Sequence, residues 1–185
     1  DDEFGKEFIN LFKDLGVNIQ STQVVKNCST RIIKVCINDE GDRSFAGFVN
    51  SQKQFADEML DRKVFERSEI SLPTLFKNTR YFITGTNLLA SDKSSEALLF
   101  LVEYASKSGV SIVIDANWRE IFWDKLDKSS QIQKQDHIQK IKKFLLNGDI
   151  LKLSNEEAIL FFGNNNPFKI SQSLSKKPDV IITNG

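Results

Sequence analysis

Val110-Ser111-Ile112-Val113-Ile114-Asp115-Ala116-Asn117-Trp118-Arg119 is the stretch that decides the fold. Its first five residues are mostly β-branched and apolar, and two polar acceptors and a guanidinium follow within five more. An apolar run this short, ending in charge, predicts a buried strand that carries polar side chains to its carboxyl end. In open α/β sheets, ligands bind at that edge. We therefore expect a binding site built on Asp115, Asn117 and Arg119.

Strands and helices alternate on both sides of this stretch. Apolar runs predict further strands at 81–83, 149–153 and 179–183, and helical periodicity predicts a helix over 98–105 and another over 138–145. Such alternation is typical of βαβ units and a parallel sheet. We predict the α/β class, with a doubly wound, mainly parallel sheet flanked by helices.

The amino-terminal third has a different pattern. Apolar residues at helical spacing, followed by Gly16, predict a helix from about Lys6 to Leu15. Two runs of β-branched and aromatic residues, 31–37 and 44–49, surround a polar turn and predict an antiparallel hairpin. The hairpin would form a small layer separate from the parallel sheet.

Composition excludes several classes of partner. The 185 residues contain 25 lysines and arginines and 25 aspartates and glutamates, so the net charge is zero. No long-range positive field attracts polyanions, and we expect neither a nucleic-acid nor a membrane partner. A chain of this length suits one domain and buries roughly 70% of its unfolded surface.

The cysteines and the chain ends indicate the compartment and the extent of the fold. Cys28 and Cys36 lack the neighbouring ligands that a zinc site needs, so we expect reduced packing residues in a cytoplasmic protein. No apolar run approaches the roughly 18 residues of a membrane span, and the amino end has no signal-peptide pattern. Both ends look cut, so we expect a fold truncated at each.

The carboxyl ends of the predicted strands carry Thr84, Asp115, Ser154 and Thr183, which a parallel sheet brings to one edge. Such a crevice can hold hydroxyls, phosphate oxygens or a hydrated cation. Each residue also has a simpler structural interpretation. Ser154 followed three residues later by Glu157 is a capping box, yet the same helix start can face phosphate, with Glu157 holding a magnesium-bound water.

Two further residues have structural alternatives. Because Asp115, Asn117 and Arg119 alternate, they would point the same way if the strand continued, with Trp118 and Trp123 packed beneath. Alternatively, Arg119 forms an ion pair with Asp115 that closes the turn. His137, the only histidine, lies in a polar stretch, where a solvent-facing helix position is expected.

Several motifs, taken in order, resemble the ribokinase/PfkB family of carbohydrate kinases, and within it the fructokinases. The start of the chain is similar to the family's Gly-Asp-Asp-x-Phe-Gly, and the hairpin turn to the Asp-Gly-x-Arg-x-Phe of its lid. The central stretch is similar to Asp-Pro-Asn-x-Arg followed by Leu-Trp, with Ala116 in place of proline. The matching segments are Asp1 to Gly5, Gly41 to Phe45, Phe55 to Asp57, Asp115 to Arg119 with Trp123, Lys152 to Glu157 through Gly163, and Ile182 to Gly185.

The resemblance implies ATP- and magnesium-dependent phosphoryl transfer to a sugar hydroxyl. It implies a ribokinase-like body of residues 1–20 and 50–185, a β-hairpin lid of residues 21–49, and a homodimer formed through that lid. The implied sugar-binding residues are Asp115, Asn117 and Arg119, the implied nucleotide-binding residues are Ser154, Thr183 and Gly185, and the implied magnesium residue, acting through water, is Glu157.

The resemblance also implies what this chain lacks. The family's catalytic aspartate lies in a Gly-Ala-Gly-Asp loop that would follow Gly185, so no catalytic base is expected among the 185 residues. Without that loop, we expect the chain alone to be inactive. Two alternatives stay open: a 2-keto-3-deoxygluconate kinase, which shares the Asp-x-Asn-x-Arg motif, and a non-catalytic kinase-like binding protein.

Overall fold

The fold comes from a computed structural model that describes residues 2–41, 43–49, 54–66, 71–123 and 131–184. Its helices are α1 (Glu3–Asp14), α2 (Arg62–Glu66), α3 (Leu72–Phe76), α4 (Asp92–Lys107), α5 (Gln131–Leu145), α6 (Asn155–Phe162) and α7 (Pro167–Ser173). Its strands are β1 (Ile32–Ile37), β2 (Arg43–Val49), β3 (Tyr81–Gly85), β4 (Ser111–Asp115), β5 (Ile150–Ser154) and β6 (Asp179–Thr183). Three short 3₁₀ turns are η1 (Ala56–Met59), η2 (Asn87–Ala90) and η3 (Glu120–Phe122).

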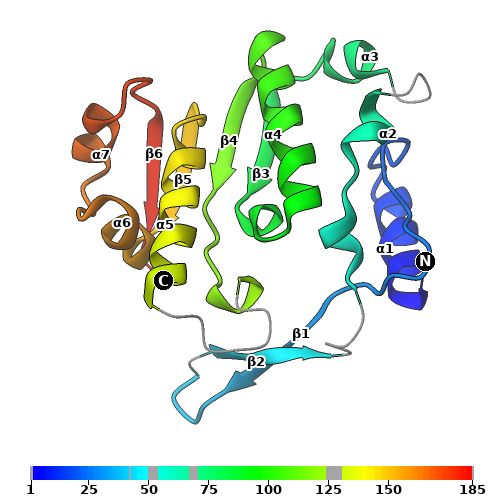
Figure 1. The fold of residues 1–185 in the computed structure, drawn as a ribbon, viewed down its shortest axis with the longest axis horizontal. Coiled ribbons are helices and arrows are strands. Elements are labelled where there is room, and N and C mark those ends of the chain that lie inside the picture. The colour runs from blue at the N-terminus through cyan, green and yellow to red at the C-terminus, as the bar shows by residue number, and fades with distance from the viewer. Residues whose placement is uncertain (1, 42, 50–53, 67–70, 124–130, 185) are drawn as a thin grey trace.

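The four carboxyl-terminal strands form one parallel sheet in the order β3-β4-β5-β6. Their carboxyl ends point to the same side of the molecule, which Figure 1 shows facing the β1–β2 hairpin. Helices α4, α5 and the pair α6–α7 provide the crossovers between consecutive strands. The predicted α/β class and parallel sheet are therefore confirmed.

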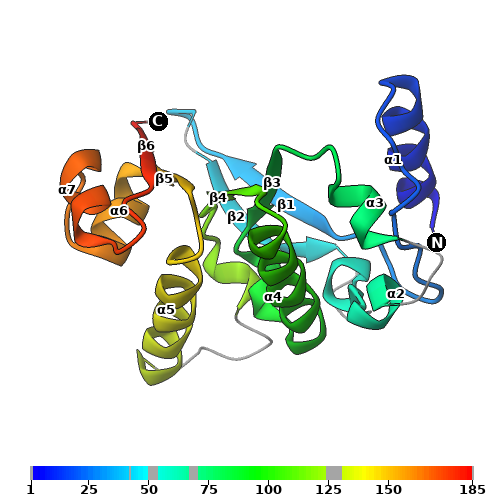
Figure 2. The ribbon, with the colours of Figure 1, turned by 90° about the horizontal axis from the view of Figure 1, so that it is seen from above.

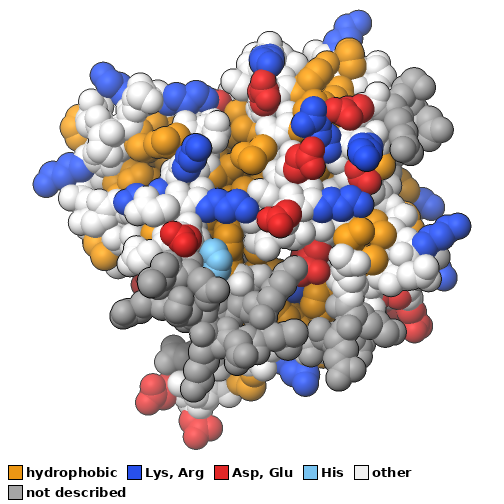
Figure 3. Space-filling model, in the orientation of Figure 1, with side chains coloured by type: hydrophobic (Ala, Val, Ile, Leu, Met, Phe, Trp, Pro, Cys, Tyr) orange, Lys and Arg blue, Asp and Glu red, His pale blue; other side chains and the backbone are white. Residues whose placement is uncertain are grey.

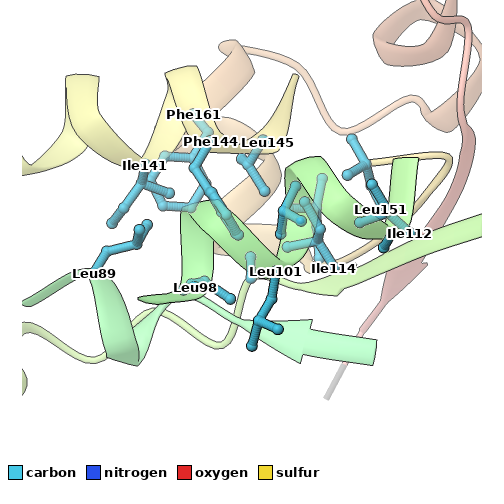
Figure 4. Close-up of a cluster of buried hydrophobic side chains, with 14 of the residues drawn as sticks. Leu89, Leu98, Leu101, Ile112, Ile114, Ile141, Phe144, Leu145, Leu151 and Phe161 are labelled. Carbon is cyan, nitrogen blue, oxygen red and sulfur yellow. The ribbon is translucent and has the colours of Figure 1, made fainter. Parts of the chain in front are cut away.

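Helices α4 and α5 cover one face of this sheet (Figure 2). Alternate residues of β4 and β5 are buried in the core on this face, and the residues between them are half-buried. Both strands are therefore mostly apolar. Removing one such buried aliphatic side chain costs about 2–5 kcal/mol. Figure 4 shows the cluster, which includes Leu89, Leu98, Leu101, Ile112, Ile114, Ile141, Phe144, Leu145, Leu151 and Phe161.

The opposite sheet face and helix α1 leave apolar side chains exposed. Ile83 of β3 is 72% exposed and Ile181 of β6 is 52% exposed. Helix α1 buries none of its residues, and its apolar stripe includes Phe8 and Leu11.

Strands β1 and β2 form the predicted antiparallel hairpin, with a register shift between Ile33 and Val35. The inner end of the hairpin packs on the body through Ile33 and Phe48, which lie against the core. The turn end, at Gly41, is exposed. Figure 1 shows the hairpin lying across the side of the molecule at which the parallel strands end.

Several element boundaries differ from the sequence prediction by a few residues, and two of them have a clear local cause. Helix α1 begins at Glu3, three residues early, because the Asp2 carboxylate caps it by accepting the Gly5 amide at 2.9 Å. Strand β3 continues to Gly85, because Thr84 and Gly85 pair with the end of β4. The predicted strand at 81–83 therefore ends two residues too soon.

One side-chain prediction was wrong. Both cysteines are free, as expected, but Cys36 is exposed on the hairpin and is not a packing residue, whereas Cys28 is half-buried. His137 lies on α5 as predicted and is half-buried, with its ring 4.8 Å from the ring of Trp123.

The charged side chains on the face that carries α4 and α5 are mixed in sign (Figure 3). This mixture agrees with the zero net charge of the sequence. Within the described ranges, the helices are too short or too polar to cross a membrane.

Candidate functional site

The ends of β3, β4, β5 and β6 lie together at the carboxyl edge of the parallel sheet, and β4 ends before β5. Asp115 pairs with Gly85 on one side and with Lys152 on the other. Ser154 pairs with Thr183. The edge is therefore a real convergence of the predicted residues, although Asp115 lies two rungs before Ser154 along β5.

Asp115 forms an ion pair that the sequence prediction missed. Both of its carboxylate oxygens accept from the Lys152 ammonium at 3.0 Å. The two side chains are 41% and 39% exposed, so water still reaches the pair. In this arrangement the carboxylate has a fixed orientation at the edge of the crevice.

The backbone after Asp115 turns out of the sheet. Ala116 makes one more ladder bond, from its amide to the Lys152 carbonyl at 2.9 Å, and its own carbonyl accepts from the Thr86 hydroxyl. Asn117 then has a φ of 41°, in the left-handed region that asparagine tolerates better than most residues. The predicted strand-like alternation of Asp115, Asn117 and Arg119 was wrong, because the strand ends before Asn117.

Arg119 points toward the hairpin. Its guanidinium donates to the Trp118 carbonyl at 2.8 Å and lies 5.1 Å from the ring centre of Phe45 on β2. Since Asp115 pairs with Lys152, the Arg119–Asp115 ion pair is absent among the described contacts. The guanidinium is only partly satisfied by the carbonyl, so it keeps donors for an anion or for hydroxyl groups.

The carboxylate of Glu157 connects the end of β5 with the loop after β4. The capping box is present: the Ser154 hydroxyl accepts the Glu157 amide at 3.2 Å, and the Glu157 carboxylate accepts the Ser154 amide at 2.8 Å. The second carboxylate oxygen accepts the Trp118 amide at 2.5 Å. Glu157 is 6% exposed, so this carboxylate is a buried connection between α6 and the loop after β4.

The start of α6 carries a second acidic group. Glu156 is exposed, and its carboxylate accepts from the Ser154 hydroxyl at 2.8 Å. That hydrogen bond lowers the pKa of Glu156. The Ser154 hydroxyl is thus shared between the cap and Glu156.

The end of β6 provides the other wall. The Thr183 hydroxyl is exposed and makes one long contact, 3.5 Å to the Leu153 carbonyl. It is therefore available to a ligand at the edge. Gly185, the remaining predicted nucleotide residue, lies outside the described residues.

Two tryptophans support the loop from below, as the sequence predicted. The Trp118 ring lies 5.6 Å from Trp123 and 6.4 Å from Phe161 of α6. The Lys140 ammonium lies 5.8 Å from the Trp123 ring. This packing fixes the loop whose backbone Glu157 holds.

Glu157 fits magnesium through a metal-bound water but not through direct coordination. Both oxygens of Glu157 already accept amide hydrogens, so direct coordination would break one of these bonds. Each carboxylate oxygen has a second lone pair that can accept from a metal-bound water. Among the described residues, no three His, Cys, Asp or Glu side chains cluster as a metal site.

The sequence prediction missed Lys152 and Thr86 as parts of the site, and it missed the contact of the Trp118 amide with Glu157. Alternation along the predicted strand 149–153 could have placed Lys152 on the face of Ser154. The contacts of Trp118 and Thr86 join residues 39 and 30 positions apart, and neither has a local sequence signal.

Comparison with known proteins gives a consistent group of relatives. The family profile described as pfkB family carbohydrate kinase matches residues 1–185. Probable fructokinase-5 of Arabidopsis thaliana is 28% identical over 183 residues, which cover 99% of this chain and 48% of the relative. A 5-dehydro-2-deoxygluconokinase of Clostridium perfringens is 25% identical over 128 residues, or 69% of this chain and 36% of the relative.

The fold has close counterparts among solved structures. The fructokinase from Xylella fastidiosa with bound ATP superposes with a TM-score of 0.78 at 20% identity, covering 100% of this chain and 53% of that one. The chain thus spans about half the length of the curated relatives and solved structures it matches.

Proposed function

Because the chain belongs to the pfkB family of carbohydrate kinases, we propose that it is part of a fructokinase-like enzyme that transfers a phosphoryl group from ATP to a sugar hydroxyl. The observation that carries the proposal is the family match over residues 1–185. The convergence of Asp115, Ser154 and Thr183 at one sheet edge supports it.

The acceptor side of the proposed site is the loop after β4. Asp115, oriented by Lys152, and Asn117 offer acceptors to sugar hydroxyls, and Arg119 donates to hydroxyls or to phosphate charge. The β1–β2 hairpin lies over this side as a lid, with Phe45 against Arg119. A lid of this kind excludes water from the transferred group.

The nucleotide side is the start of α6 and the end of β6. Helix α6 has its amino end at Ser154, where the helix dipole favours phosphate. Because the capping box already pairs the Ser154 and Glu157 amides, we assign this role to the dipole and the Ser154 hydroxyl. Thr183 offers a hydroxyl. By the family resemblance we assign Gly185, which lies outside the described residues, to nucleotide binding as well. Glu157 would hold a magnesium-bound water, and magnesium, when bound, would neutralise the charge of the phosphates.

Phosphoryl transfer also needs a base for the acceptor hydroxyl and donors for the developing charge. The family resemblance assigns neither role to a residue of this sequence. The 185-residue chain alone therefore gives no turnover in our proposal, and the activity belongs to a protein of the relatives' length. We also propose a cytoplasmic location and a homodimer formed through the hairpin.

A second candidate substrate is a sugar acid. The similarity to 5-dehydro-2-deoxygluconokinase covers 69% of this chain at 25% identity, which is close to the identity with the fructokinase relative. Arg119 can pair with a carboxylate in two-donor geometry. This candidate shares the proposed site and differs only in the acceptor.

A coupled ADP-release assay on the complete gene product tests the proposal. Fructose, 5-dehydro-2-deoxygluconate and 2-keto-3-deoxygluconate are compared as acceptors, with ATP and magnesium present. Turnover that is highest with fructose supports the leading assignment, and a preference for either sugar acid supports the alternative. No turnover with any sugar would leave the non-catalytic kinase-like protein as the better description.

A further inference from the structure

Arg31 lies inside a cage of three aromatic rings at the base of the hairpin. Its guanidinium carbon is 4.1 Å from the ring centre of Phe55, 4.6 Å from Phe48 and 4.8 Å from Phe122. The Phe48 ring also packs edge-on against both other rings, at 5.5 and 5.4 Å. One cation therefore holds three rings together.

Two carboxylates complete the cage. The guanidinium Nε lies 2.9 Å from the Asp57 carboxylate, and one terminal nitrogen lies 3.1 Å from Glu58. The Arg31 side chain is only 10% exposed. Charge pairs and cation–aromatic contacts strengthen when water is excluded, so this contact is stronger than the exposed ion pairs of the helices.

The three rings come from three separate parts of the chain. Phe48 belongs to β2 of the hairpin, Phe55 to the segment that returns from the hairpin to the body, and Phe122 to η3. The turn η3 directly follows the site loop, with the Phe122 amide donating to the Arg119 carbonyl at 3.1 Å. Arg31 thus connects the hairpin base to the loop that carries Arg119.

Among the described residues, the bonds that join the start of the hairpin to the body gather at Ser29 and Thr30. Ser29 makes two backbone hydrogen bonds with the segment that returns from the hairpin. Its amide donates to the Gln54 carbonyl at 3.1 Å, and its carbonyl accepts from the Ala56 amide at 3.0 Å. These bonds fix one point just before β1. A single bonded point permits rotation of the strands beyond it, whereas the planar guanidinium and its three rings fix a direction.

We propose that Arg31 is a positioning residue, the pivot that sets the angle of the β1–β2 hairpin over the carboxyl edge of the parallel sheet. The functional meaning of that angle rests on the proposed function, in which the hairpin covers the sugar. The pivot itself is a property of the chain with or without a ligand.

The distance between two spin labels measures the hairpin angle directly. One label goes on Cys36, which is exposed on β1, and the other on Ser106→Cys, which is exposed on α4, in a Cys28→Ser background. The test variant is Arg31→Lys, which keeps a charge beside Asp57 but loses the planar stacking group. In the reference we expect one narrow distribution of label distances. In Arg31→Lys we expect the population with a displaced hairpin to be about tenfold or more larger, because lysine loses the planar stacking that the guanidinium makes with the rings.

Arg62→Lys is the matched control. Arg62 also stacks on a ring, at 4.7 Å from Phe100, and also pairs with a glutamate, at 2.8 Å, but it lies on α2. We expect its distance distribution to equal the reference. Arg31→Met with Asp57→Asn, which removes the pair without leaving that carboxylate unpaired, should displace the hairpin as Arg31→Lys does.

Three results would overturn the proposal. The first is an unchanged distance distribution in folded Arg31→Lys, and the second is equal broadening in Arg62→Lys. The third is loss of the folded circular dichroism spectrum in both Arg31 variants, which would give Arg31 a role in overall stability instead. Neither sugar nor ATP is present, so failure of the proposed kinase function leaves each result interpretable.

Discussion

Glu157→Gln removes one charge from a buried group that makes two backbone contacts. The carboxylate accepts the Ser154 amide with one oxygen and the Trp118 amide with the other. Glutamine keeps one acceptor oxygen, but its amide nitrogen is a donor and would face one of these N–H groups. The substitution therefore cannot preserve the capping box and the Trp118 contact together.

The size of the effect follows from these contacts. Losing a hydrogen bond to a charged group costs about 1.5–3 kcal/mol, and a buried donor left without a partner costs about 1–3 kcal/mol. These two figures describe overlapping parts of one loss, so we expect about 2–4 kcal/mol in the free energy of unfolding. For a domain of this size the melting temperature would fall by about 4–16 °C.

Thermal unfolding followed by circular dichroism measures this loss, with Glu156→Gln as the matched control. Glu156 is the exposed neighbour of Glu157. Among the described side chains, its carboxylate accepts a hydrogen bond from the Ser154 hydroxyl alone. We expect its melting temperature to stay close to that of the parent. Hydrogen exchange adds a local readout, because the Trp118 amide should exchange faster in Glu157→Gln alone.

Equal melting temperatures for Glu157→Gln and the parent, with a protected Trp118 amide, would refute the reasoning. That result would mean that water or another acceptor replaces the carboxylate at little cost. A normal melting temperature with a raised magnesium requirement in the complete enzyme would instead favour a purely metal-directed role.

Four shorter predictions follow. Hydrogen bonds from Thr30 and Gly5 lower the pKa of Asp2 from 3.8 to about 2; its contribution to stability is therefore present above pH 3.8 and lost as the pH falls toward 2, and circular dichroism should show this acid step in the parent but not in Asp2→Asn. Lys152→Met should change stability by about 1 kcal/mol or less, as for an exposed ion pair, while raising the sugar KM of the complete enzyme because Asp115 loses its orientation. Arg119→Ala in the complete enzyme should lower kcat about 100-fold if the guanidinium meets transferred charge, whereas a raised KM with normal kcat would limit it to sugar binding. Phe8→Gln on the exposed face of α1 should raise the temperature at which light scattering detects association, and an unchanged onset would exclude that face as the association surface.

The parallel sheet could be predicted because its signals are local. Strand β4 has the apolar centre Ile112 to Ile114, and its position beside β3 and β5 follows from βαβ alternation. The end of β3 could not be predicted, because Gly85 is a strand residue only through its partner Asp115. The start of α1 had a visible signal in the capping residue Asp2, which the periodicity argument overlooked.

The candidate site was predicted as a set of residues but not as a set of contacts. Ser154 and Glu157 were recognised as a capping box because three residues separate them, and the structure has that box. Of the two interpretations of Arg119, the ion pair with Asp115 was wrong, because the partner of Asp115 is Lys152 from the next strand. Spacing along the chain reports helix geometry well, but it reports contacts between strands only after the register is known.

The loop after β4 is where the long-range contacts of the site meet. Lys152 and Thr86 hold Ala116, Glu157 holds the Trp118 amide, and Arg119 lies against Phe45 of the hairpin. These partners come from β5, the segment after β3, α6 and β2. One short stretch of backbone therefore contacts α6 through Glu157 and the hairpin through Arg119. The sequence shows the capping box at Glu157, but the contacts to Trp118, Thr86 and Phe45 have no local signal because each joins elements far apart in the chain.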